Sequence, residues 1–300
     1  MKSKFVLSIG ALILCFGAAA GQKSRAKPAS VPTPVIFAVL HDGKTVEPIA
    51  LVKENKLSSI DGGDKADEKP FGAKYYSPDT AYTLIFGGAA DGTVKISKSN
   101  IGTECGGTSA DIVSKPEKAK LSGLVMALAT NAKLDSRPGV RRRPTALERE
   151  EIESLVRAQF RRVGVSEATL KNLRYQNLTA LDMDHDGTPE FVGSYWVLPK
   201  SDERRLLFFI AEKGKSGKYA FTHEDYSAVT PKDVMSGDPK DLDNGIGHEL
   251  LLDALDYDND GVDEVFTIDQ AFEGNNYHVY KREAGKWVKA FEAYNYRCAY

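Results

Sequence analysis

The sequence predicts a mainly β, α+β protein with one amphipathic helix, whose C-terminal half holds two duplicated four-stranded, blade-like units. Three observations indicate this fold class. Runs of β-branched and aromatic residues, bounded by Gly, Pro, Asn and Asp, recur along the chain. Only one long segment has apolar residues at helical spacing. An acidic motif occurs twice, each time between two strand-like runs.

The composition indicates a folded chain of one large or two medium domains. It has 300 residues, of which 42% are hydrophobic, enough to bury a sizeable core. The formal net charge of −2 gives no general attraction to nucleic acid or to an anionic membrane. We therefore expect no nucleic-acid partner.

Residues 1–20 are predicted to be a signal peptide. Two lysines in the first four residues precede an apolar run over 5–21, and small residues end it with a cleavage site after Ala20. The protein is therefore expected to be secreted or to reside in the periplasm or cell envelope, with no integral membrane segment after cleavage. A retained anchor, for which the apolar run is short, and a lipoprotein attached through Cys15 are the alternatives.

A flexible tether and a β-rich domain are expected next. Residues 21–33 are rich in Lys, Ser, Ala and Pro without periodicity, which is typical of a tether. Residues 34–130 are predicted to form a β-rich N-terminal domain, in which 118–130 fits either a strand or a short helix. Its strand-like runs are 34–40 and 46–52, joined by a His-Asp-Gly hairpin turn, then 81–86 and 93–97.

Residues 131–144 are predicted to be a linker, because Pro and Gly interrupt regular structure and few apolar residues are left to bury. Arg141, Arg142 and Arg143 could bind a polyanion. Three arginines beside two prolines are more typical of a solvated connector, since patches that bind nucleic acid or lipid are longer and more continuous.

The region 145–300 is predicted to contain one helix followed by the two repeats. Thr145 and Glu148 have the spacing of a capping box, and Gly164 is placed to end the helix in a left-handed conformation. The apolar stripe that should face the core consists of Ile152, Leu155, Val156, Phe160 and Val163.

The repeats are read from two sets of four strand-like runs. Each set has the order strand, acidic loop, strand, turn, strand, Gly-Lys-aromatic turn, strand. Self-similar four-stranded units are typical of blade-like repeats. The first set covers 174–181, 190–198, 205–212 and 218–223, and the second covers 248–255, 263–270, 276–282 and 286–293.

The acidic loops, 181-LDMDHDGTPEF-191 and 255-LDYDNDGVDEV-265, are predicted to bind two calcium ions. Carboxylates at positions 1, 3, 5 and 9 repel one another unless a cation lies among them, and glycine at position 6 permits a sharp turn. Calcium takes six to eight oxygen ligands, whereas zinc prefers His or Cys. The predicted ligands are Asp182, Asp184, Asp186, the Thr188 carbonyl and Glu190, then Asp256, Asp258, Asp260, the Val262 carbonyl and Glu264; the two carbonyls are assigned by analogy with other calcium loops.

Two other kinds of acidic loop are compared with this pattern by their residue requirements. An EF-hand needs a bidentate Glu at position 12 and flanking helices, but this chain has Gly193 and Thr267 there, with strand-like flanks. An acidic turn without any ion, held by Asp side chains that accept backbone hydrogen bonds, remains open.

TALDMDHDGTPEFV and DALDYDNDGVDEVF resemble the DxDxDGxxD/E repeats of the FG-GAP and VCBS families, with Glu in place of Asp at the ninth position. The resemblance covers about residues 148–297. It implies calcium-binding loops and a β-propeller-like arrangement of blades. Two such units cannot close a ring of at least four blades, so other strands must contribute or the units form an open sheet or a sandwich.

After removal of the signal peptide, Cys105 and Cys298 remain as a candidate disulfide, with two unpaired thiols as the alternative.

The sequence favours a non-catalytic exported protein that binds an unknown protein or glycan and uses calcium structurally. It contains no nucleophile elbow, phosphate loop or dinucleotide motif, and gives no catalytic or cofactor-binding residue beyond the calcium ligands. Its histidines form no metal-binding pair: they are His41, His185, His223, His248 and His278, of which His185 is expected to be solvated. A polymer hydrolase with the repeats as an accessory region and a structural cell-envelope protein are the alternatives. The aromatic residues that could form a binding surface, or else pack in the core, are Tyr195, Trp196, Tyr277, Tyr280 and Trp287.

Overall fold

The computed structural model describes residues 32–60, 65–134 and 137–298. The predicted signal peptide and most of the predicted tether lie outside these ranges. Residues from Thr33 onward form one compact unit. This unit is mainly β, as predicted, and all its strand pairs are antiparallel. In the described part of the chain, no helix is long and apolar enough to cross a bilayer.

The N-terminal β region is a six-stranded barrel. Its strands follow the order β1-β7-β4-β5-β6-β2, and the additional pairing of β2 with β1 closes the ring. The predicted hairpin joins β1 to β2, and the segment 118–130 contains a strand rather than a helix. The bounds are β1 Val35–Leu40, β2 Thr45–Lys53, β4 Ala81–Phe86, β5 Ala89–Ser99, β6 Ala110–Pro116 and β7 Ala127–Thr130, with β3 (Lys56–Ser58) added beside β2.

Helix α1 (Lys65–Tyr75) was not predicted from the sequence. It has Pro70 in its interior, which removes a hydrogen-bond donor, and it lacks a regular apolar stripe. Near its C-terminal end, Phe71 and Tyr75 pack into the core of the barrel, where Phe71 lies edge-on to Phe37 at a ring-centroid distance of 6.4 Å. The helix is therefore held by aromatic packing at one end.

The predicted amphipathic helix is α2 (Ala146–Arg162), and its limits are set as expected. The Thr145 side chain accepts from Glu148 N, and the Glu148 carboxylate accepts from Thr145 N at 2.7 Å. Gly164, with φ +84°, follows its end. The predicted apolar stripe packs, with the short helix α3 (Glu167–Leu170), on one face of the sheet that follows.

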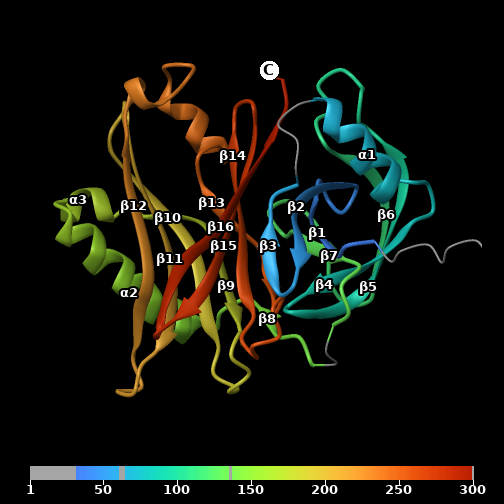
Figure 1. Ribbon diagram of the computed structural model, residues 1–300. Coiled ribbons are helices and arrows are strands. Elements are labelled where there is room, and N and C mark those ends of the chain that lie inside the picture. Colours follow the sequence, from blue (N-terminus) through green and yellow to red (C-terminus); the bar gives the residue numbers. More distant parts are fainter. Residues whose placement is uncertain (1–31, 61–64, 135–136, 299–300) are drawn as a thin grey trace, which may run out of the picture. The chain divides into compact units, whose positions relative to one another are not determined.

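This second sheet has the order β12-β11-β10-β9-β8. In Figure 1, α2 and α3 lie beside its outer face. The short strand β8 lies within the predicted linker, where two of the three arginines pair with the end of β9. The bounds are β8 Arg141–Arg142, β9 Arg174–Leu181, β10 Glu190–Lys200, β11 Glu203–Lys213 and β12 Tyr219–Val229.

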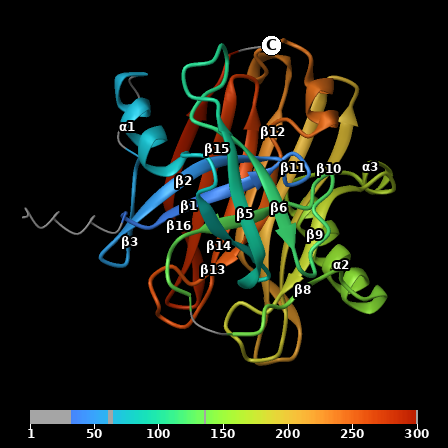
Figure 2. The same ribbon diagram turned by 90° about the vertical axis from the view of Figure 1, so that its right-hand side faces the viewer.

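The third sheet, β13-β14-β15-β16, lies between the second sheet and the barrel (Figure 1). One of its faces, with Leu250 and Phe266, packs against the barrel. The other, with Leu251 and Val265, packs against the second sheet. Figure 2, viewed from the barrel side, shows β1, β2, β5 and β6 in front of this sheet. The bounds are β13 Glu249–Leu255, β14 Glu264–Ala271, β15 Gly274–Glu283 and β16 Lys286–Tyr296, preceded by 3₁₀ turns at Pro231–Asp233 and Pro239–Asn244.

A buried ion pair joins the barrel, the linker and the third sheet. Asp253 is completely buried, and both of its carboxylate oxygens accept from Gly87 N, at 2.9 and 3.0 Å. Arg141 donates to Asp253 at 3.1 Å and to the carbonyl of Leu252 at 2.7 Å, with a side chain only 6% exposed. For Arg141 the prediction of a solvated connector was therefore wrong.

A second buried polar cluster also joins the barrel to the third sheet. Glu47 on β2 is fully buried and accepts from Tyr277 OH at 2.6 Å and from the side-chain amides of Asn275 and Asn295. Arg297 forms an ion pair with it. Beside it, Cys105 and Cys298 form the predicted disulfide, with their sulfur atoms 2.12 Å apart. The C-terminal end is thus attached to the barrel by charge, hydrogen bonds and a covalent bond.

We expect Arg141→Met to lower the free energy of unfolding by about 3–5 kcal/mol, because it leaves the buried Asp253 carboxylate without its cation. The matched variant Arg142→Met, one residue further along, removes an arginine whose side chain is 39% exposed and should cost less than about 1 kcal/mol. Urea unfolding followed by circular dichroism measures both. Equal losses in the two variants would contradict the assignment of Arg141 as an anchor.

Candidate functional site

Both acidic loops are strand-to-strand connections. The first joins β9 to β10 and the second joins β13 to β14, within the antiparallel pairs that place Leu181 opposite Glu190 and Leu255 opposite Glu264. No helix flanks either loop, so neither is an EF-hand, as the sequence predicted. The ninth-position Glu of each loop is the first residue of a buried strand, which fixes its place at the base of the loop.

The two loops fold in the same way. In each, the position-9 Glu accepts from the N–H of position 2, the position-1 Asp accepts from the Gly at position 6, and the position-5 Asp accepts from the N–H of position 7. The pairs are Met183–Glu190 (2.7 Å), Gly187–Asp182 (3.2 Å) and Thr188–Asp186 (2.6 Å) in the first loop, and Tyr257–Glu264 (3.2 Å), Gly261–Asp256 (3.1 Å) and Val262–Asp260 (3.0 Å) in the second. These side-chain-to-backbone bonds also fit the ion-free turn.

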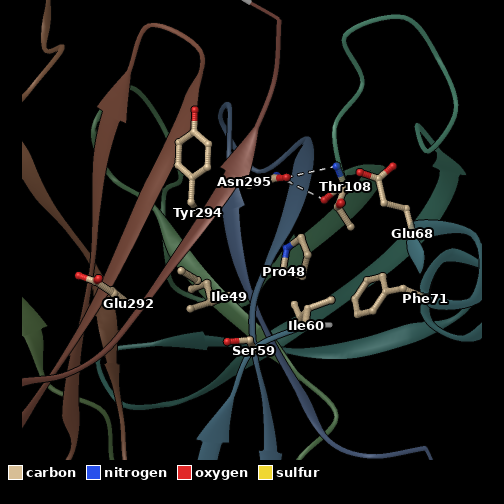
Figure 3. A pocket seen from close by; sticks show the side chains of 11 residues that line it. Pro48, Ile49, Ser59, Ile60, Glu68, Phe71, Thr108, Glu292, Tyr294 and Asn295 are labelled. Carbon is tan, nitrogen blue, oxygen red and sulfur yellow. Dashed lines mark hydrogen bonds between the residues drawn. The ribbon is translucent and has the colours of Figure 1, made fainter. Parts of the chain in front are cut away.

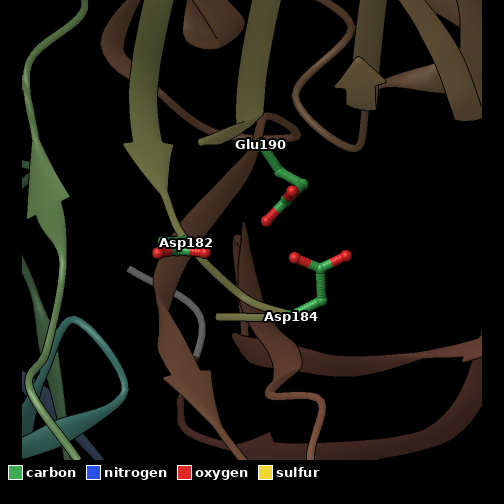
Figure 4. A group of neighbouring side chains, drawn as sticks. All are labelled: Asp182, Asp184 and Glu190. Atoms are coloured by element: carbon green, nitrogen blue, oxygen red, sulfur yellow. The ribbon is translucent and has the colours of Figure 1, made fainter. Parts of the chain in front are cut away.

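In the first loop, Asp182, Asp184 and Glu190 come together. Each offers an oxygen, and these oxygens lie within 4.8 Å of one another. Figure 4 shows the carboxylates of Asp184 and Glu190 pointing toward one another, with Asp182 beside them. Asp186 is outside this group. Asp182 and Asp184 lie in the loop and Glu190 begins β10, and all three supply hard oxygen donors, the donor type that calcium prefers.

Glu190 is the electrostatically strained member of the first loop. Its side chain is only 5% exposed. Burial is the largest cause that raises the pKa of Glu190 to about 8. The nearby Asp184, Glu212 and Asp182 carboxylates also raise the pKa, and the hydrogen bond from Met183 N lowers it. A divalent cation among these oxygens would favour the ionised form.

In the second loop, Asp256, Asp258 and Asp260 form the corresponding group within 4.8 Å. Here Glu264 is drawn to a lysine on β15, because Lys281 Nζ lies 3.0 Å from Glu264 Oε1, 2.5 Å from Asp258 and 2.7 Å from Asp260. Arg137 also binds Asp256, at 2.5 Å. Burial raises the pKa of Glu264 to about 8 despite the lysine.

The two loops touch each other. Asp263 N donates to Met183 O at 2.8 Å, and His185 Nε2 lies 3.5 Å from the Asp263 carboxylate. Asp263 is buried and faces Gly88 of the barrel, where a Cβ would lie 2.1 Å from its oxygen. Asp263 is therefore not one of the three aspartates that converge in the second loop. The expectation of a solvated His185 was wrong, since its side chain is 24% exposed and faces the neighbouring loop.

A polar cluster that sequence reasoning missed lies inside the third sheet. Glu249 accepts from Thr267 Oγ1 at 2.6 Å and from Tyr280 OH at 2.7 Å, and lies 3.0 Å from His278 Nδ1. Nearby, His223 Nδ1 lies 3.1 Å from the Trp287 carbonyl. These six residues come from five strands, β12 to β16, so no local motif could reveal them. One oxygen of Glu249 on β13 has three partners, which lie on β14 and β15, so Glu249 links these three strands.

The five aromatic residues proposed as a binding surface are all in the core, each at most 3% exposed. The exposed aromatics that lie close to one another are Tyr294 and Tyr296 on β16, with ring centroids 6.5 Å apart. Tyr294 also borders a cavity of about 280 Å³ between β16 and the barrel. Figure 3 shows Glu68 and Glu292 on opposite sides of that cavity, so its carboxylates do not converge.

Comparison of the chain with protein-family models, with curated proteins and with solved structures gave no match. Inferences about function therefore depend on the geometry described above.

His248 makes stability depend on pH. It is 1% exposed, its Nε2 lies 2.8 Å from the Leu242 carbonyl, and burial lowers its pKa. Below about pH 6.5, His248 therefore binds a proton in the unfolded chain that it does not bind in the folded chain. We expect its contribution to stability to be complete above that pH and to be lost as the pH falls below it.

Urea unfolding at about pH 7.5 and about pH 5.5 measures this loss. A His248→Gln variant should lose less stability between the two conditions than the wild type. An equal loss in both proteins would show that His248 does not cause the dependence.

Proposed function

We propose that this protein is an exported, non-catalytic module that binds calcium in its acidic loops and uses the ion structurally. The observation that carries the proposal is the convergence of Asp182, Asp184 and Glu190 oxygens within 4.8 Å, with Glu190 buried. A cation there relieves the repulsion among these groups and joins the ends of β9 and β10. The carbonyls of Thr188 and Val262 would complete the ligand sets of the two loops.

We further propose that β9–β12 and β13–β16 are two copies of one FG-GAP/VCBS-type unit. Both are antiparallel sheets in simple sequential order, and their loops share three equivalent hydrogen bonds. The two units pack face to face through an apolar layer instead of completing a ring of blades. The barrel covers the remaining face of the second unit.

The disulfide supports export to an oxidising compartment, either outside the cell or in the periplasm or envelope. For the partner, we propose a protein or glycan that contacts the exposed Tyr294 and Tyr296 beside the cavity, since tyrosines combine an apolar ring with a hydrogen-bonding hydroxyl. A polymer hydrolase and a structural envelope protein remain alternatives that no observation on the described residues favours.

Calcium should raise the melting temperature of the purified protein. Extracellular calcium modules bind with a Kd of about 10⁻⁴–10⁻³ M. At about 10 mM calcium this adds about 1.4–2.7 kcal/mol to the free energy of unfolding, which corresponds to a rise of several degrees. Scanning calorimetry in calcium and in chelator measures the difference.

Asp184→Asn should remove most of this response, because it takes a charged ligand from the converging set. The matched control is Asp202→Asn, which neutralises an aspartate in an exposed turn and should keep the full response. Identical melting curves of the wild type in chelator and in excess calcium would refute the proposed function.

A further inference from the structure

The two acidic loops differ in the residue that faces their ninth-position glutamate. If the pairing of Phe191 with Ala211 between β10 and β11 is extended by one residue, Glu190 lies opposite Glu212. Continued in the same way, the register of β14 and β15 sets Lys281 opposite Glu264. At equivalent positions of the two sheets, one loop therefore has an additional carboxylate and the other has an ammonium group.

Lys281 occupies the centre of the second loop. Its Nζ lies 2.5 Å from Asp258 Oδ2, 2.7 Å from Asp260 Oδ2 and 3.0 Å from Glu264 Oε1. An ammonium has three N–H donors, so three carboxylates satisfy all of them. These carboxylates stand at loop positions 3, 5 and 9, and a calcium ion would need oxygens of the same positions at about 2.3–2.6 Å. The ammonium and the metal ion therefore compete for one place.

Among the described residues, no lysine forms an ion pair with a carboxylate of the first loop. Arg282, the neighbour of Lys281 on β15, points the other way along the pleat and reaches Asp184 at 2.9 Å and Glu212 at 3.1 Å. Within the described ranges, no lysine or arginine forms an ion pair with Asp182 or Glu190. Arg282 thus neutralises part of the charge on Asp184, and Asp182 and Glu190 are the carboxylates left for an external cation.

We propose that Lys281 is a built-in replacement for the metal in the second loop, so that the chain binds one calcium ion, in the first loop, instead of two. This inference rests on the proposed calcium-binding function. The negative charge of the two loops is then neutralised in different ways. In the first loop an ion from solution neutralises it, and in the second loop a side chain of the neighbouring strand does so.

Calcium stoichiometry, measured by isothermal titration and by native mass spectrometry, tests the proposal. The wild type should bind one ion, and Lys281→Met should bind two. The matched control Lys286→Met, which removes an exposed lysine of β16, should still bind one. Two ions in the wild type, or one in Lys281→Met, would overturn the inference about Lys281.

The position of the single ion is tested by Asp184→Asn and Asp258→Asn. With Lys281 unchanged, Asp184→Asn should abolish calcium binding, and Asp258→Asn should still bind one ion. The reverse result would overturn the proposal. The outcomes also separate the two proposals. Binding by neither the wild type nor Lys281→Met refutes the calcium function itself, while two ions in the wild type leave that function intact.

A measurement on the unaltered protein covers the case in which Lys281→Met does not fold. Acetic anhydride modifies exposed lysines faster than lysines held by carboxylates, and peptide mass spectrometry gives the rate at each site. The rate at Lys281 should be low and the same in calcium and in chelator. A several-fold increase at Lys281 in calcium, with Lys286 unchanged, would show that the ion displaces the ammonium and would overturn the proposal.

Discussion

The third sheet has no solvent-facing side over most of its area, and the arrangement of the rest of the compact unit follows from this. Its strands alternate Leu250 and Leu252 toward the barrel with Leu251 toward the second sheet, so both faces must be covered. Apolar surface left in water costs about 25 cal/mol per Å², so each face is favourable only when another sheet covers it. The barrel and the second sheet are thus bound to the same central layer.

The buried carboxylates between the barrel and the third sheet all have charged or hydrogen-bonding partners. Asp253 and Glu47 are fully buried, yet each is held by an arginine and by hydrogen-bond donors from other elements. Such pairs add little net stability over apolar residues, but they penalise any packing that separates the partners. The apolar layer therefore drives association, and the buried carboxylates restrict it to one relative position of the barrel and the sheet.

The sequence predicted the local elements well and their long-range partners poorly. The capping box of α2, its apolar stripe and the strands on either side of both acidic loops depend on nearby residues, and they were found. Arg141 was misjudged because its partner, Asp253, lies 112 positions away. Likewise, the aspartate spacing predicted two equivalent loops, but it could not show that Lys281 reaches one of them or that Asp263 faces the barrel. Helix α1, held by one aromatic end, left no periodic signal.

The disulfide has a topological effect apart from its contribution to stability. It links Cys105 in the barrel region to Cys298, so the backbone between them forms a covalent ring of most of the chain. The acidic loops and all strands of the second and third sheets belong to this ring. A protease that cuts once in any surface turn of these sheets opens the ring without releasing a fragment. A molecule nicked in this way would therefore keep both of its halves until the disulfide was reduced.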